Sequence, residues 1–99
     1  MRKITMETGK AFNKAMPFKE SNTEIIVLPN VTIMKLFGNN IAYKYNDPQQ
    51  TLSITNCGYS TPTTKDRLNA IDGVNIVQRN NVWYLNGKEW DGELIDVNI

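Results

Sequence analysis

Short strand-forming runs separated by closely spaced glycine and asparagine pairs are the feature that most constrains how this chain folds. Gly38-Asn39, Asn80-Asn81, Asn86-Gly87 and Asp91-Gly92 are pairs of this kind. Each favours a two-residue turn, because glycine and asparagine accept the positive φ angles that such turns require. Strands joined by turns this short run antiparallel. The spacing therefore predicts an antiparallel sheet built largely of hairpins.

Residues 23–57 are predicted to form a four-stranded meander, because branched residues and turn signals alternate along them. Its central hairpin turns at Gly38-Asn39, where glycine at the first central position fits a type II′ turn. This turn would place Leu36 opposite Ile41 and Met34 opposite Tyr43. The core face would then hold Met34, Leu36, Ile41, Tyr43, Leu52 and Ile54, and the outer face Lys35, Ala42, Lys44, Thr51, Ser53 and Thr55.

The best-marked helix is predicted over residues 61–72. Two starts fit equally well: Thr63 as the N-cap with Asp66 in the capping-box position, or Thr61 as the cap with Pro62 at the first helical position. Gly73 is suited to the left-handed residue that ends a helix. A helix at this place would pack on one face of the sheet.

Residues 1–20 are interpreted as a basic N-terminal arm or a short helix. Apolar residues fall at helical spacing over residues 8–16, and Pro17 prevents continuation. Up to Lys19, five residues are positive and Glu7 alone is negative. Opposite charges at the two ends of the chain attract each other, and a basic arm could also contact a polyanion.

Residues 74–97 are predicted to form a hairpin followed by an acidic tail. The Asn80-Asn81 turn places Gln78 opposite Trp83, and a short strand over residues 88–90 folds back after Asn86-Gly87. Val74, Ile76, Trp83 and Leu85 would share the core face. The sequence thus predicts a single α+β domain over residues 1–99: an antiparallel meander, one helix and a C-terminal hairpin.

Composition leaves little chemistry for catalysis. The 99 residues contain no histidine and one cysteine, Cys57, which excludes Ser-His and Cys-His pairs. No spacing of acidic residues suggests a carboxylate metal site. We therefore expect a protein that is not an enzyme, with no catalytic residue, metal or cofactor. A lone cysteine cannot form an internal disulfide, and no apolar run suits export or a membrane span, so a reducing cytoplasm is expected.

The segment that leads into the helix of residues 61–72 is the first candidate binding site. Hydroxyls, an aromatic ring and two cations gather where free backbone N–H groups favour an anion such as a phosphate. The simpler interpretation is that the threonines cap the helix and that the cations are solvated. The candidate residues are Tyr59, Thr61, Thr63, Thr64, Lys65 and Arg67.

The C-terminal hairpin carries the second candidate, a protein interface formed by Arg79, Tyr84 and Trp90. Trp83 is expected in the core, whereas Tyr84 lies on the opposite face beside Arg79. Tyrosine and arginine are enriched at interface hot spots, and an aromatic ring beside a cation also suits base stacking. An N-terminal helix packed over the same face would remove this surface.

The order of motifs resembles a family of small proteins encoded by bacteriophages and related mobile elements. The matching runs are residues 36–42 with the Gly-Asn-x-Ile-Ala turn, residues 61–69 with Thr-Thr-x-x-Arg-Leu-Asn, and residues 83–92 with Trp-Tyr-Leu-Asn-Gly. Phe37 stands where that family usually has a histidine, so a role for the histidine does not carry over. The resemblance implies a product made inside an infected bacterium, among accessory proteins that commonly bind host components.

Two functions follow as hypotheses. The first is a non-enzymatic accessory protein that binds a host protein, such as a defence or regulatory factor. The second is a binder of nucleic acid or a nucleotide signal through the helix start at residues 61–67, assisted by the basic arm. Sheet edges also invite pairing, so a homo-oligomer is left open.

Overall fold

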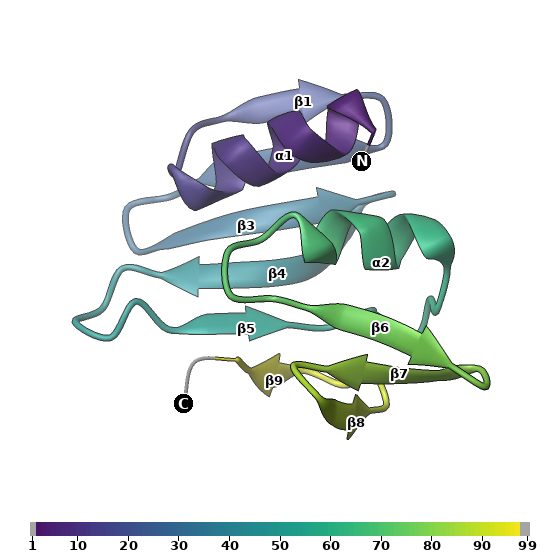
Figure 1. Cartoon of the computed structure of the whole chain (residues 1–99). Coiled ribbons are helices and arrows are strands. Elements are labelled where there is room, and N and C mark those ends of the chain that lie inside the picture. Colours follow the sequence, from purple (N-terminus) through teal and green to yellow (C-terminus); the bar gives the residue numbers. More distant parts are fainter. Residues whose placement is uncertain (1, 98–99) are drawn as a thin grey trace.

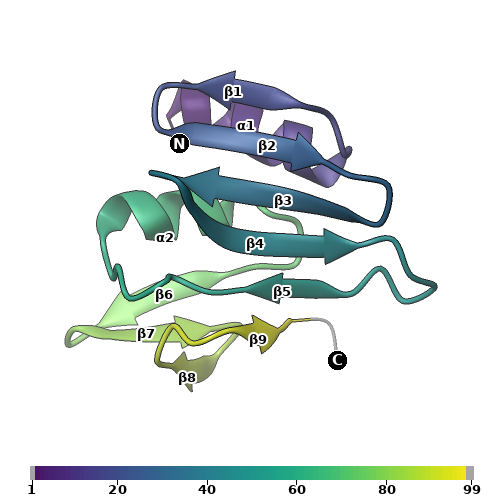
Figure 2. The same ribbon diagram turned by 180° about the vertical axis from the view of Figure 1, so that it is seen from behind.

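The computed structural model describes residues 2–97, which fold into two layers. Over these residues, one layer is a six-stranded antiparallel sheet, and the other combines two helices with a three-stranded sheet (Figure 1). Seen from behind, the helices lie on one side of the large sheet (Figure 2). The predicted α+β class is confirmed, as is the order of a short helix, a meander, a second helix and a hairpin.

The large sheet has the strand order β1-β2-β3-β4-β5-β9, and the small sheet has the order β6-β7-β8. Strands β1 and β9 are additions to the predicted meander, and each is too short to leave a periodic signal. Their bounds, with those of the other elements, are α1 (Lys3–Asn13), β1 (Phe18–Glu20), β2 (Thr23–Val27), β3 (Val31–Leu36), β4 (Asn39–Tyr45), β5 (Leu52–Ile54), α2 (Pro62–Asn69), β6 (Ile76–Arg79), β7 (Val82–Leu85), β8 (Lys88–Trp90) and β9 (Ile95–Asp96).

A continuous hydrophobic core fills the space between the two layers. Phe12 of α1, Met34 of β3 and Leu68 of α2 are fully buried there. Trp83 and Trp90 of the small sheet join the same core, and their ring centroids lie 6.1 Å apart. Burial of side chains this large is the main stabilising contribution in a domain of this size.

Helix α1 differs from the predicted helix over residues 8–16. It begins at Lys3 and ends at Asn13, so Met16 is exposed and outside the helix. The buried face of α1 includes Thr5, Thr8 and Gly9. Because threonine and glycine are not strongly apolar, a search for apolar residues at helical spacing does not detect this part of the helix. Gly9 is buried because α1 passes so close to the end of α2 that a Cβ atom there would lie 2.5 Å from the Ala70 carbonyl oxygen.

The β3–β4 hairpin turns one residue earlier than predicted. Its central residues are Phe37 and Gly38, both with positive φ, and Leu36 pairs with Asn39. The predicted pairs of Leu36 with Ile41 and of Met34 with Tyr43 are therefore wrong. A bulge after Met34 places both Ile41 and Ala42 in the core. Met34 pairs with Ala42, and Tyr43 pairs with Ile33 on the face away from the helices.

Strand β5 confirms Leu52 and Ile54 as core residues. Ser53 pairs with Tyr43 on the predicted outer face, yet it is buried there. Its hydroxyl donates to the carboxylate of Asp96 on β9, so the unpredicted strand covers it. In the small sheet, the Asn80-Asn81 turn and the pair of Gln78 with Trp83 are confirmed.

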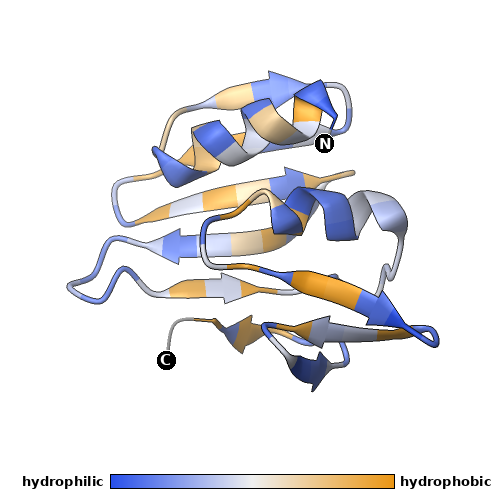
Figure 3. Ribbon diagram, in the orientation of Figure 1, coloured by the Kyte–Doolittle hydropathy of each residue, from blue (hydrophilic) through white to orange (hydrophobic). Residues whose placement is uncertain are grey.

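Helix α2 starts at the second of the two predicted positions. Thr61 is the N-cap and accepts a hydrogen bond from the backbone N–H of Thr64, while Pro62 occupies the first turn. The helix ends at Asn69, so the predicted end at residue 72 is too late, although Gly73 does have positive φ. Figure 3 shows α2 as largely hydrophilic, and polar contacts therefore carry much of its anchoring.

Asn69, the last residue of α2, binds the edge of the small sheet. Its amide nitrogen donates to the backbone oxygen of Ile76 at 3.0 Å, and its amide oxygen accepts from the backbone nitrogen of the same residue at 2.6 Å. These two bonds resemble those that a neighbouring strand would make. They fix α2 relative to β6.

Candidate binding site

The six residues predicted around the start of α2 lie in three separate environments. Arg67 is buried beneath the helix, Thr63 and Lys65 line an open groove on its outer side, and Tyr59, Thr61 and Thr64 line a cleft on its other side. Residues adjacent in sequence therefore do not converge on one point. A single anion at the helix start could not contact all six.

Arg67 anchors α2 to α1 and to β2. Only 2% of its side chain is exposed, which contradicts the expectation that it is solvated. Nε donates to the Thr23 hydroxyl at 3.1 Å, and Nη1 donates to the Thr5 hydroxyl and to the Asp66 carboxylate. Burial lowers the pKa of the guanidinium, the charge of Arg2 lowers it further and Asp66 opposes both. An arginine still remains charged at neutral pH, so Arg67 is a structural cation.

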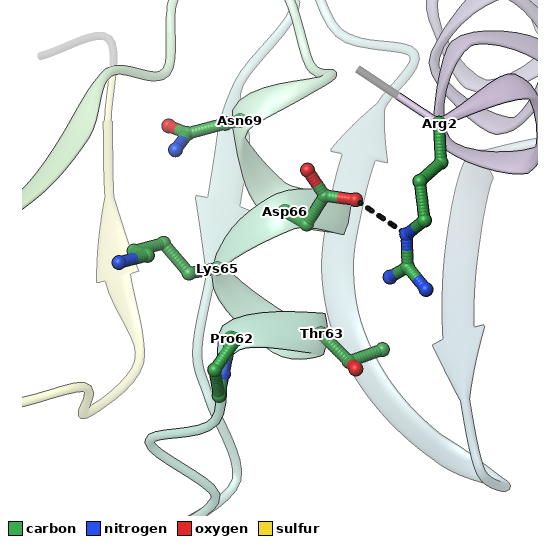
Figure 4. Close-up of a pocket in the computed structure, with 6 residues that line it drawn as sticks. All are labelled: Arg2, Pro62, Thr63, Lys65, Asp66 and Asn69. Atoms are coloured by element: carbon green, nitrogen blue, oxygen red, sulfur yellow. Dashed lines mark hydrogen bonds and ion pairs between the residues drawn. The ribbon is translucent and has the colours of Figure 1, made fainter.

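The open groove beside α2 has a volume of about 710 Å³ and carries both signs of charge. Arg2 reaches it from the start of α1 and contacts Asp66, with Nε 3.4 Å from the carboxylate oxygen (Figure 4). Lys65 points away from this pair and donates to the side chain of Gln78 at 3.2 Å. Because a carboxylate lies between the cations and each cation has a partner, the groove is not arranged around an anion.

The cleft on the other side of α2 is smaller and more apolar. It has a volume of about 220 Å³ and lies between the tip of the β3–β4 hairpin and the segment before α2. Leu36 and Ile41 form its buried floor, and the ring of Tyr59, 56% exposed, forms one side. Its lining residues are Leu36, Phe37, Asn39, Ile41, Asn56, Tyr59, Thr61 and Thr64.

Phe37 lines this cleft and is not among the candidate site residues predicted from the sequence. Its side chain is 68% exposed, and its φ angle is +52°, a conformation that costs an L-residue about 1–2 kcal/mol. Glycine or asparagine would occupy the same position with less strain. A large apolar side chain that is exposed at a strained position is therefore a candidate for a functional surface.

Asn56 lines the cleft and orders the segment that carries Tyr59. It is buried, its amide donates to the Ser60 hydroxyl at 3.2 Å, and its amide oxygen accepts from the backbone N–H of Gly58 at 2.8 Å. Gly92 packs so closely on this amide that a Cβ atom would lie 2.1 Å from its nitrogen. The segment that carries Tyr59 is therefore held in place before any partner binds.

Cys57 lies near this segment but has the character of an unreactive thiol. Its sulfur donates to the backbone oxygen of Asn40 at 3.2 Å. Partial burial raises the pKa of the thiol, with a smaller opposite effect from Thr55, so the thiol stays protonated at neutral pH. The geometry gives Cys57 no feature of a nucleophile.

The residues of the predicted interface on the C-terminal hairpin also lie in different environments. Trp90 is buried, and its indole nitrogen donates to the backbone oxygen of Glu93 at 2.9 Å. The prediction that Trp90 lies in an exposed interface is therefore wrong. Tyr84 is half-buried and pairs with the exposed Val77 on the outer face of the small sheet, with Arg79 exposed nearby. Helix α1 lies over the other end of the molecule and leaves this face open (Figure 1).

Residues 2–97 contain no group of three or more cysteine, aspartate or glutamate side chains close enough to hold a metal ion. Within the same residues, neither helix is long and apolar enough to cross a membrane.

Comparison with known proteins gives a family match. The model of a family described as Kyanoviridae Gp96 protein matches residues 1–96. The search of curated proteins and the search of solved structures returned no match.

Proposed function

Because the chain belongs to the Kyanoviridae Gp96 protein family, a family of phage proteins, we propose that it binds a host protein during infection through the cleft between Phe37 and Tyr59. The partner inserts one apolar side chain between these two rings. The phage origin implied by the motif resemblance is supported by the family match. The resemblance also favours an accessory role, since accessory proteins of this kind commonly act by binding.

The main observation in support of this proposal is the exposed ring of Phe37. Aromatic rings are enriched in the cores of protein interfaces, where a few well-packed anchors contribute most of the binding energy. Phe37 and Tyr59 are carried by preformed backbone segments, because the β3–β4 turn fixes the backbone at Phe37 and the Asn56 hydrogen bonds to Gly58 and Ser60 fix the segment of Tyr59. Preorganisation of this kind lowers the entropy cost of binding.

The size of the cleft favours a protein side chain over a nucleotide. Pockets that enclose drug-sized ligands measure about 300–1,000 Å³, and this cleft measures about 220 Å³. A leucine, methionine or phenylalanine side chain fits that space. The nucleic-acid or nucleotide alternative has weaker support, because Arg67 is buried and Lys65 and Arg2 are held by Gln78 and Asp66.

The test is affinity capture from host lysate combined with crosslinking and mass spectrometry. The wild-type chain is compared with Phe37→Asn, which removes the ring at a position where asparagine tolerates the backbone conformation. We expect a host protein whose recovery falls at least tenfold with Phe37→Asn. Met6→Ala is the matched control, because Met6 is an apolar residue of similar exposure on α1, outside the cleft.

Recovery that is equal for the wild type and Phe37→Asn contradicts the proposal, as does the absence of any reproducible host protein. A second arm titrates the purified chain with single- and double-stranded DNA, RNA and cyclic nucleotides at two salt concentrations. Binding that weakens steeply with salt would support the nucleic-acid alternative instead.

A further inference from the structure

The face of the large sheet opposite the helices is uncovered among the described elements (Figure 2). Register places Ile26, Ile33 and Tyr43 in one line across β2, β3 and β4 on this face. Val31 and Tyr45 form the next line, and Tyr45 stacks on Tyr43 with ring centroids 6.2 Å apart. None of these five residues belongs to the hydrophobic core cluster or is among the half-buried residues packed on it.

This composition is unusual for a solvent-facing sheet. Antiparallel sheets with one wet face normally alternate apolar residues inward with polar residues outward. Strand β3 is apolar on both faces instead, since Met34 and Leu36 face the core while Val31 and Ile33 face outward. Such a pattern is typical of a strand covered on both sides.

We propose that this face binds a second copy of the same chain, with the two large sheets packed face to face about a two-fold axis. The axis runs along the strands, between β2 and β3. It places Ile26 of one copy against Ile33 of the other, and Ile33 against Ile26. Sheets packed in this way keep their strands within about 30° of each other.

Charge complementarity selects this arrangement. Beside the apolar lines, Lys19, Glu24 and Lys35 form a row of alternating charge across β1, β2 and β3. Glu24 and Lys35 lie opposite each other in register, yet within residues 2–97 they form no ion pair. An axis between β2 and β3 brings Glu24 of each copy to Lys35 of the other. An axis through β2 or through β3 would instead oppose like charges.

The contact is also extensive. The described residues span 39 × 31 × 21 Å, and the sheet lies in the broad plane. An axis between β2 and β3 overlaps β1, β2, β3 and β4 of each copy, so most of the large sheet takes part in the contact. The cleft of Phe37 and Tyr59 lies on the opposite side of the sheet with α2, so a dimer presents two clefts and gains avidity for any partner with repeated sites.

The experiment measures oligomeric state by light scattering and sedimentation on the full chain. Wild type is expected at twice the mass of the chain. Glu24→Lys and Lys35→Glu should each raise the dissociation constant of the dimer at least tenfold, because each opposes like charges twice. An equimolar mixture of the two variants should recover the dimer, since every contact then joins opposite charges.

Lys10→Glu on α1 and Glu89→Lys on β8 are the matched controls and should leave the mass unchanged. Circular dichroism verifies that every variant folds. The proposal is overturned if wild type is monomeric at several hundred micromolar, if the single variants dimerise as wild type does, or if their mixture stays monomeric. Phe37→Asn should dimerise normally, so this result is separable from that of the host-protein proposal.

Discussion

Replacement of Gly9 by alanine tests the close approach of α1 to α2. In an isolated helix, the change from glycine to alanine stabilises by about 1 kcal/mol. Here the added Cβ atom would lie 2.5 Å from the Ala70 carbonyl oxygen and 2.7 Å from the Ala70 Cβ atom. Carbon atoms in contact prefer about 3.5–4.0 Å, so the helices must separate by nearly 1 Å. Overpacking of this kind costs about 1–3 kcal/mol.

The backbone oxygen of Ala70 cannot rotate away, so we expect the upper part of that range. After subtraction of the gain in helix propensity, Gly9→Ala should destabilise the protein by about 1–2 kcal/mol. Thermal unfolding would then shift down by about 5–15 °C. Ala70→Gly in the same chain should restore part of the loss, and Lys10→Ala should have little effect. A higher midpoint for Gly9→Ala would refute the close approach.

The remaining predictions concern strain, burial and pH. Phe37→Asn should stabilise by about 1 kcal/mol in urea unfolding, because asparagine adopts positive φ at lower cost; a lower midpoint would contradict the assigned strain. Arg67→Met should destabilise by about 2–4 kcal/mol, because it removes the buried donor to the Thr5 and Thr23 hydroxyls and one of the cations beside Asp66; a loss below about 1 kcal/mol would contradict its anchoring role. Hydrogen bonds from the hydroxyl and the backbone N–H of Thr51 lower the pKa of Asp47 below its ordinary value of 3.8. A depressed carboxylate pKa contributes stability that is present above the unfolded value and is lost as pH falls through the folded value, so Thr51→Val should reduce the difference in stability between pH 7 and pH 2.

The two central turns show how far the sequence determines the sheet. The Asn80-Asn81 turn was predictable because both residues accept positive φ, and its register follows from its length. The exact position of the β3–β4 turn was not predictable, because Phe37 has a positive φ angle, which is rare for a bulky residue. The bulge in β4 then exchanges the faces of Ala42 and Tyr43, an effect that period-two alternation does not encode.

The candidate site was predictable only in part for a related reason. Helix capping by Thr61 depends on neighbours in sequence, so local rules identified it as one of two starts. Burial of Arg67 depends on Thr5 and Thr23, which are distant along the chain, and no local pattern joins them. The cleft depends on the approach of the Phe37 turn to the segment of Tyr59, which only the tertiary fold produces.

Asn69 has a consequence for how the small sheet can interact with other chains. Exposed strand edges are templates on which other chains can polymerise. The side-chain amide of Asn69 occupies both backbone groups of Ile76, so the outer border of β6 is already saturated there. One polar residue at a helix terminus thereby blocks strand addition at Ile76 on the β6 edge, without adding a charge or a proline.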